Sequence, residues 1–330
     1  MWIRPRGELM EPKRIDVVAM GELLIDFAAL RTDPEGYPTM AAHPGGAPCN
    51  FLAALSRYGV ETAFLGKVGS DTFGELLVKS LSACGIHTEG VVRDPSVFTT
   101  LAFVTLDSTG DRHFSFARKP GADTRLLFSE CRLELMDQAK IFHFGTLSLT
   151  DEPAAETTRA LVAYAKRRGQ LISFDPNLRL PLWPDTDRAR EAILWGLAQA
   201  DIVKISDEEV AFLWNCGPEE GAEKLLREFG VKLVFVTLGP RGAYFANANG
   251  AGYARTIAVK PVDTTGAGDI FGGSAVGQIL KTGKRPEDLT GPELTEIASF
   301  ASAAASLSTC VYGGLSSVPA YETVVRHMRQ

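Results

Sequence analysis

The stretch that decides the fold is PVDTTGAGDIFGG, residues 261–273, which lies directly before the apolar, small-residue segment SAVGQILKTG, residues 274–283. The second segment has the composition of a buried helix, so the polar stretch lies at a helix N-terminus. Backbone N–H groups are unpaired there and carry partial positive charge. Gly266, Ala267 and Gly268 lack bulk, so their amides could close on an anion.

Asp269 would stand beside that anion, where a carboxylate is repulsive unless it does chemical work. Removing a proton from a hydroxyl that attacks a phosphoryl group is such work. The glycines 266, 268 and 272 do not match the G-x-G-x-x-G dinucleotide fingerprint, and the sequence has no G-x-x-x-x-G-K-[ST] loop. On this stretch alone, a capped helix that only packs closely is an equally good interpretation.

Two further segments carry polar residues in unusual places. HPGGAPCNFLAALSRYG, residues 43–59, sets Gly45 and Gly46 before a helix and Asn50 in its first turns. Asparagine is a poor helix former, so Asn50 is a candidate hydrogen-bonding group, although a turn satisfied by the backbone would explain it too. Asp26 lies in the apolar strand MGELLIDF, where a carboxylate is costly unless it is paired or used. Asp26 and Asn50 together could orient the hydroxyls of a sugar.

Strand-like and helix-like segments alternate along most of the chain. Strands are expected at 14–21, 62–69, 139–145, 170–177, 200–206 and 231–239, and helices at 48–59, 71–85, 153–169, 207–215 and 218–229. This order predicts an α/β fold with a mostly parallel central sheet and helices on both faces, which binds ligands at the carboxyl ends of its strands.

A hairpin-like segment interrupts this alternation. TTLAFVTLDSTGDRHFSFAR, residues 99–118, predicts two strands joined by a turn around 108–111. With residues 26–44 it is expected to form a small β-sheet lid, so that lid segments of roughly 26–44 and 94–121 are inserted in one domain, 15–330. Residues 1–14 are expected to be a flexible leader.

Composition narrows the functional class. The 330 residues are 45% hydrophobic and 22% charged, with a formal net charge of −6 and no run of Lys or Arg, so a nucleic-acid partner is not expected. No apolar run is long enough for a bilayer span and the start lacks a secretion signal, so no membrane partner is expected. The five scattered cysteines indicate reduced thiols in a cytoplasmic protein.

Taken together, these segments resemble the ribokinase-like carbohydrate kinases, also called the PfkB family. GGAPCNFLAALSRYG with FLGKVGSDTFG, within residues 45–74, resembles the first signature of that family, and DTTGAGDIFGG, residues 263–273, resembles the second. The resemblance runs from about Ile15 to Pro319. Segments such as SFDPNLRLPLW (173–183) and DIVKISDEEVAFL (201–213) are most similar to fructokinases.

This resemblance implies a ribokinase-like fold and an enzyme that transfers the γ-phosphoryl group of ATP, with Mg²⁺, to a sugar hydroxymethyl group. For a fructokinase the acceptor is the 6-hydroxyl of D-fructose. Asp269 matches the general base, and the amides of Gly266, Ala267 and Gly268 match an anion hole. The positions that match sugar contacts are Asp26, Gly45, Gly46 and Asn50. The positions that match nucleotide contacts are Asn177, Thr237, Gly239, Gly242 and Gly268.

The resemblance also implies metal sites. Glu209 matches the acid of an N-x-x-E motif that organises Mg²⁺ through water, although Ser206 replaces the asparagine of that motif. The positions that match a monovalent-cation site, often for K⁺, are Asp263, Thr265, Gly313 and Ser317. Arg118 and Arg179 lie in fructokinase-like segments and are candidates for sugar or phosphate contacts, but exposed charge explains them equally well.

Alternatives remain at this stage. Another kinase of the same family, acting on 2-keto-3-deoxygluconate or ribose, would fit the same motifs, and a keto-acid substrate would need Arg or Lys near its carboxylate. A non-catalytic sugar-binding protein is disfavoured by the intact Asp269. Because a lid built as a small sheet leaves strands exposed, we expect a homodimer joined through the lids, with a monomer as the alternative.

Overall fold

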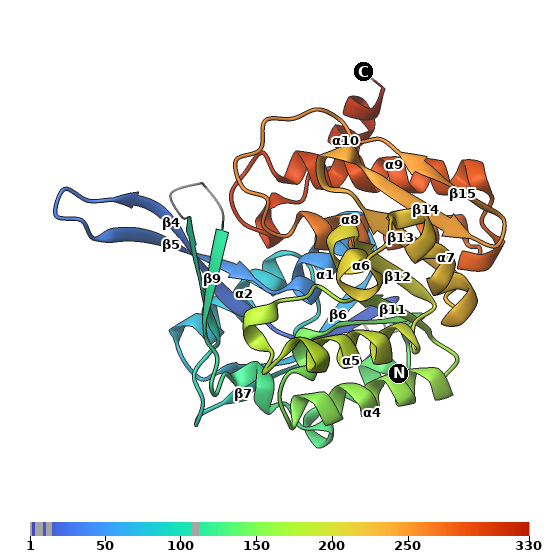
Figure 1. Cartoon of the computed structure of the whole chain (residues 1–330). Coiled ribbons are helices and arrows are strands. Elements are labelled where there is room, and N and C mark those ends of the chain that lie inside the picture. The colour runs from blue at the N-terminus through green and yellow to red at the C-terminus, as the bar shows by residue number, and fades with distance from the viewer. Residues whose placement is uncertain (1, 4–8, 11–14, 107–111, 330) are drawn as a thin grey trace.

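A nine-stranded sheet forms the centre of the molecule in the computed structural model, which describes residues 2–3, 9–10, 15–106 and 112–329 (Figure 1). Its strands lie in the order β15-β14-β13-β12-β11-β10-β3-β6-β7. Neighbouring strands from β13 to β7 are parallel, whereas β14 and β15 run antiparallel at one edge. The bounds are β3 Val17–Met20, β6 Thr62–Gly69, β7 Val91–Asp94, β10 Ile141–Gly145, β11 Leu171–Asp175, β12 Ile202–Ser206, β13 Leu233–Thr237, β14 Ala243–Asn247 and β15 Gly250–Ala254.

Helices cover both faces of this sheet, which confirms the expected fold class. In β3, Val18 and Met20 pack into one core and Val17 and Ala19 into another, because successive side chains of a strand point to opposite faces. The first core contains residues of α3 Leu133–Met136, α4 Ala154–Arg167, α5 Thr186–Leu197, α6 Asp207–Trp214 and α7 Pro218–Glu228. The opposite side is built by α1 Ala47–Arg57, α2 Thr72–Ala83, α8 Ala267–Thr282, α9 Gly291–Ser308 and α10 Tyr321–Met328.

Local chemistry sets the helix ends. The Asp71 carboxylate accepts hydrogen bonds from the N–H groups of Phe73 and Gly74, at 3.0 and 2.9 Å, and so caps α2 as the sequence predicts. Gly85 follows the same helix with φ of 79°, a conformation that glycine adopts without strain.

A second, four-stranded sheet forms at the residues expected for the lid. Its order is β5-β4-β8-β9, with bounds β4 Leu24–Thr32, β5 Pro38–Gly45, β8 Leu101–Leu106 and β9 Arg112–Ala117. The hairpin of β4 and β5 projects away from the body of the molecule (Figure 1). Phe27 of β4 stacks on Phe103 of β8 at 5.2 Å and meets Phe73 of α2 edge-on at 5.7 Å, which joins the small sheet to the body.

Some expectations fall on residues that the structure does not describe. The turn at 108–111 is one of them. Of the expected leader, only Trp2–Ile3 (β1) and Leu9–Met10 (β2) are described, and these pairs form an antiparallel ladder. Within the described ranges, every helix is too short or too polar to cross a membrane.

Candidate active site

Asp269 lies in the first turn of α8 and is almost fully buried. Gly266 is the N-cap of helix α8, and its φ of 77° places it in the left-handed region that favours glycine. One carboxylate oxygen of Asp269 accepts a hydrogen bond of 2.8 Å from Nδ2 of Asn50, in α1. The two residues are 219 positions apart, so this contact depends on how α1 and α8 pack together.

Glycines make room for this polar centre. A Cβ on Gly266 would lie 3.0 Å from Nδ2 of Asn50, and one on Gly314 would lie 2.3 Å from its Oδ1. A Cβ on Gly45 would lie 2.0 Å from Oδ2 of Asp26. The glycine backbone therefore packs closely against the Asn50 amide and the Asp26 carboxylate, and this restricts the movement of both groups.

A cavity of about 170 Å³ opens at this centre. Residues from the end of the large sheet, from the small sheet, from α1 and from α8 line this cavity. The predicted site residues that line it are Asp26, Gly46, Asn50, Asn177, Arg179, Thr265, Gly266, Gly268 and Asp269. A pocket with several carboxylate, amide and guanidinium groups suits a polyhydroxylated ligand, since each group can accept from or donate to a hydroxyl.

Burial raises the pKa of both predicted carboxyl groups. It raises the pKa of Asp26 to about 7, against the opposing effect of the Arg179 guanidinium. Burial likewise raises the pKa of Asp269, while the Asn50 hydrogen bond, the Lys204 ammonium and Arg179 lower it. A carboxylate with a raised pKa is a stronger base once ionised, which is the property that proton removal from a hydroxyl needs.

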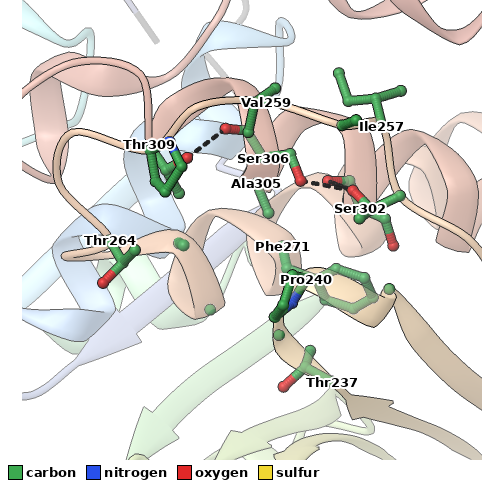
Figure 2. Close-up of a pocket in the computed structure, with 17 residues that line it drawn as sticks. Thr237, Pro240, Ile257, Val259, Thr264, Phe271, Ser302, Ala305, Ser306 and Thr309 are labelled. Carbon is green, nitrogen blue, oxygen red and sulfur yellow. Dashed lines mark hydrogen bonds between the residues drawn. The ribbon is translucent and has the colours of Figure 1, made fainter.

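A larger cavity of about 610 Å³ lies on the other side of the α8 N-terminus. Figure 2 shows its wall, where Ile257, Val259 and Phe271 contribute apolar surface and Ser302 and Thr309 contribute hydroxyl groups. The predicted nucleotide residues Thr237, Gly239 and Gly242 line it as well. Such a broad, mainly apolar cavity with a few hydroxyls is the kind that accommodates an aromatic base.

The two cavities meet at the α8 N-terminus, because Thr264 and Gly268 line both of them. A group passing from the larger cavity to the smaller one would therefore pass the backbone of Gly268, beside Asp269. The Ala267 N–H donates a long bond of 3.3 Å to the Thr264 carbonyl, which closes the turn before the helix.

Glu209 lies at the N-terminus of α6 and joins two segments at the edge of the site. Its carboxylate accepts hydrogen bonds of 2.8 Å from the N–H groups of Leu178 and Ser206. The Ser206 hydroxyl in turn accepts from the Glu209 N–H, at 3.1 Å. Serine thus forms a capping box with Glu209 in the position where the N-x-x-E motif has asparagine.

Three of the four residues predicted for a monovalent cation, Asp263, Thr265 and Gly313, contact one another. The Asp263 carboxylate accepts from the Thr265 N–H at 3.0 Å, from the Thr265 hydroxyl at 2.7 Å and from the Gly313 N–H at 3.0 Å. The Ser317 hydroxyl donates to the Gly314 carbonyl at 2.8 Å. These contacts join the loop before α8 to the loop after α9.

Two predicted residues lie elsewhere than expected. Arg118 is buried and is occupied by internal contacts: its guanidinium pairs with Asp123 at 2.7 Å and donates to Thr150 and to the Leu147 carbonyl. It therefore stabilises the fold beside the site, and neither cavity includes it in its lining. Asn177, predicted at the nucleotide, lines the smaller cavity.

Two charged residues of the site were not predicted from the sequence. Lys204 of β12 and Glu22, which follows β3, both line the smaller cavity. The available signal was the same one that identified Asp26, namely a charged side chain inside an apolar segment.

Comparison with known proteins identifies the family. Residues 14–320 match the model of the pfkB family carbohydrate kinases. The chain is 40% identical over 311 residues to a protein named "Probable fructokinase-5" from Arabidopsis thaliana, covering 92% of this chain and 94% of that protein. It is 41% identical over 310 residues to "Fructokinase-2" from Oryza sativa subsp. japonica, covering 92% of this chain and 90% of that one.

The chain is also similar in fold to solved structures of fructokinases. A fructokinase from Xylella fastidiosa with bound ATP superposes with a TM-score of 0.86 at 30% identity, covering 95% of this chain and 98% of that one. A fructokinase from Vibrio cholerae O395, bound to fructose, ADP and calcium ion, superposes with a TM-score of 0.83 at 29% identity, covering 95% and 99%. Fold, site geometry and family match together show that the chain belongs to the pfkB family of carbohydrate kinases.

Proposed function

We propose that this protein is an ATP-dependent fructokinase that phosphorylates the 6-hydroxyl group of D-fructose. The observation that carries the proposal is the meeting of two cavities at Gly268, with the buried Asp269 carboxylate beside it. The larger cavity takes ATP, and the smaller one takes the sugar. Relatives named as fructokinases, and a similar structure that holds fructose with ADP, favour fructose among the sugars of this family.

In the reaction that we propose, Asp269 removes the proton from the 6-hydroxyl of the sugar. The freed oxygen forms a bond to the γ-phosphorus of ATP, the bond from that phosphorus to the β–γ bridging oxygen breaks, and ADP leaves. Developing negative charge on the phosphoryl oxygens is stabilised by amides at the α8 N-terminus, in the segment Gly266–Ala267–Gly268. Product release leaves the proton on Asp269, from which it passes to solvent.

The sugar is held by groups that already line the smaller cavity. Asp26 and Asn50 bind hydroxyl groups of fructose, and the backbone at Gly45 and Gly46 shapes the wall of the pocket. Arg179 lies close enough to Asp26 and Asp269 to affect the pKa of both carboxyls, so it sets the charge balance of the sugar pocket.

Metal ions enter this proposal with the nucleotide. Mg²⁺ prefers oxygen ligands and keeps several waters, which agrees with the Glu209 carboxylate at the edge of the site. Mg²⁺ would arrive bound to the phosphates of ATP, as is usual where it keeps several waters of its own. Asp263, with the loop of Gly313 to Ser317, offers the oxygen atoms that K⁺ would need.

The location of the protein is proposed from its thiols. All five cysteines are free, as a reducing compartment such as the cytoplasm requires. One relative at 39% identity is named "Probable fructokinase-6, chloroplastic", so a chloroplast location is the alternative.

A panel of sugars tests the proposed function. ADP release is measured with Mg-ATP and D-fructose, D-ribose, D-glucose or 2-keto-3-deoxygluconate, each with and without K⁺. We expect the highest kcat/KM with D-fructose and a phosphorylated product at its 6-position. A higher kcat/KM with 2-keto-3-deoxygluconate or ribose would replace fructose by that substrate, and the absence of ADP release with every sugar would overturn the kinase assignment.

A further inference from the structure

Lys204 is a charged residue in the middle of a buried strand. It lies in β12, where Val203 and Ile205 point into the core beneath the sheet and Ile202 packs with Phe271 of α8 on the opposite face. Strand alternation therefore directs Lys204 toward α8. Burying an ammonium group is costly unless it is paired, so the position demands a physical reason.

One reason is visible in the next strand. The Lys204 ammonium lies 3.0 and 3.2 Å from the two carboxylate oxygens of Asp175, at the end of β11. Within the described part of the chain, this carboxylate is its one hydrogen-bond partner. An ammonium group has three N–H donors, so the pair leaves donor capacity on the side that faces the cavity.

The second observation is the distance between this ammonium and the α8 N-terminus. A Cβ built on Gly268 would lie 2.9 Å from Nζ of Lys204, so the ammonium lies directly against the backbone of Gly268. Lys204 and Gly268 both line the smaller cavity, and Gly268 lines the larger one too. The positive charge thus lies beside Gly268, the residue through which the two cavities adjoin.

Neighbouring charges keep this lysine protonated. Burial alone would lower its pKa, but the carboxylates of Asp175, Glu209 and Asp269 raise the pKa of Lys204 above its ordinary value. A raised pKa keeps the Lys204 ammonium charged at neutral pH, beside the backbone that lines both cavities.

We propose that Lys204 is a catalytic residue whose ammonium contacts the γ-phosphoryl group of ATP at the α8 N-terminus and stabilises its negative charge during transfer. Asp175 holds the lysine in place, and the absence of a side chain on Gly268 lets the ammonium reach that position. This inference rests on the proposed kinase function. The lysine takes no proton and forms no covalent bond, so the bonds made and broken are those of the phosphoryl transfer itself.

A substitution series separates this role from simple neutralisation of Asp175. Lys204→Met removes the charge and keeps an unbranched side chain. The double variant Lys204→Met with Asp175→Asn also removes the buried carboxylate that the lysine neutralises, and therefore keeps the fold testable if the single variant fails to fold. Thermal unfolding verifies folding of both.

Turnover gives the first result. We expect kcat with D-fructose and Mg-ATP to fall roughly 10²–10³-fold in Lys204→Met, the range for removing one preorganised electrostatic contact, and to stay low in the folded double variant. If the double variant recovers turnover near that of the unmodified protein, Lys204 serves only to neutralise Asp175 and the inference is wrong.

Nucleotide binding gives a result that a structural role would not produce. Calorimetry with Mg²⁺ compares ADP with the non-hydrolysable analogue AMP-PNP, which carries a third phosphate group. In the double variant, AMP-PNP should bind roughly 10- to 100-fold more weakly than to the unmodified protein, with ADP affinity nearly unchanged. Equal losses for both nucleotides would overturn the inference. Failure of the unmodified protein to bind either nucleotide would instead overturn the proposed function.

Discussion

At the scale of single residues, the site is built from carboxyl groups that the fold removes from water. Glu22 is one of them. One oxygen of its carboxyl group accepts a hydrogen bond of 2.7 Å from the Ala47 N–H at the start of α1, and the side chain lines the smaller cavity. Burial raises the pKa of Glu22 from 4.5 to about 7, with nearby Asp123 adding to the shift and Arg118 opposing it.

This shift predicts how stability depends on pH. Between pH 4.5 and 7 the folded protein keeps a proton on Glu22 that the unfolded chain has lost, so the free energy of unfolding falls as pH rises through that range. In Glu22→Gln, which carries no charge at this position, we expect the free energy of unfolding to fall less as pH rises, by up to roughly 2–3 kcal/mol. Urea unfolding at pH 5, 6, 7 and 8 measures it.

A control substitution isolates the buried group. Glu35→Gln removes an exposed glutamate at the tip of the β4–β5 hairpin and should leave the pH dependence as in the unmodified protein. The explanation fails if Glu22→Gln and the unmodified protein lose the same amount of stability between pH 5 and 8.

The sequence predicted some of these residues better than others. Asp26 and Asp269 stood out because a carboxylate in an apolar strand or beside a glycine turn needs a reason. Glu22 and Lys204 occupy equally apolar segments, but their roles depend on partners in other segments, Ala47 for one and Asp175 with Gly268 for the other. Arg118 was misplaced for the same reason, since its pairing with Asp123 is a tertiary contact.

At the scale of elements, the site depends on how closely α1 and α8 approach each other. A Cβ on Gly273 of α8 would lie 2.2 Å from the carbonyl oxygen of Phe51, in the rigid backbone of α1. We expect Gly273→Ala to separate the helices, to lower the free energy of unfolding by roughly 1–3 kcal/mol and to weaken the contact between Asn50 and Asp269. Thermal unfolding and kcat with D-fructose measure the two effects.

The same helix supplies a matched control. A Cβ on Gly277 would lie 3.5 Å from the nearest atom of Leu55, an ordinary contact distance, so Gly277→Ala should be neutral or stabilise α8 by roughly 0.5–1 kcal/mol. Equal losses of stability in the two variants would show that helix approach is not what requires glycine at position 273.

Most elements were predictable because their signals are local. Asp71 caps α2, and the apolar runs of β10 to β13 predict buried parallel strands. The hydrogen bond of Asn50 to Asp269 had no local signal, since it joins helices from opposite ends of the chain. The sequence therefore predicted which helices carry the site residues, and the packing of α1 on α8 determined that they meet.

At the scale of the whole molecule, the small sheet lies beside the smaller cavity, to which it contributes Leu24, Asp26 and Phe116. Closure of this sheet over fructose would exclude water, which competes as phosphoryl acceptor. We expect fructose to slow amide hydrogen exchange in peptides from β4 and β5, while peptides from α4, on the far face of the large sheet, exchange unchanged. Exchange that fructose leaves unaltered in β4 and β5 would contradict closure.

The projecting hairpin also bears on assembly. Tyr37 and Leu30 are exposed on it, at 70% and 53%, and β5 is an edge strand. Pairing of two lids would cover these groups. We therefore expect a homodimer in solution, and Tyr37→Lys with Leu30→Lys should shift it toward monomer. Light scattering at micromolar concentration decides this, and a monomeric unmodified protein would end the proposal.

The central claim is that Asp269 acts as the base in phosphoryl transfer to fructose, and one substitution tests it most directly. Asn in place of Asp269 keeps an oxygen that can accept the Asn50 hydrogen bond but cannot take a proton. With D-fructose and Mg-ATP, kcat for Asp269→Asn should fall roughly 10²–10⁴-fold or more, while calorimetry should find D-fructose affinity within about threefold of the unmodified protein. Turnover of Asp269→Asn close to that of the unmodified protein would contradict the account.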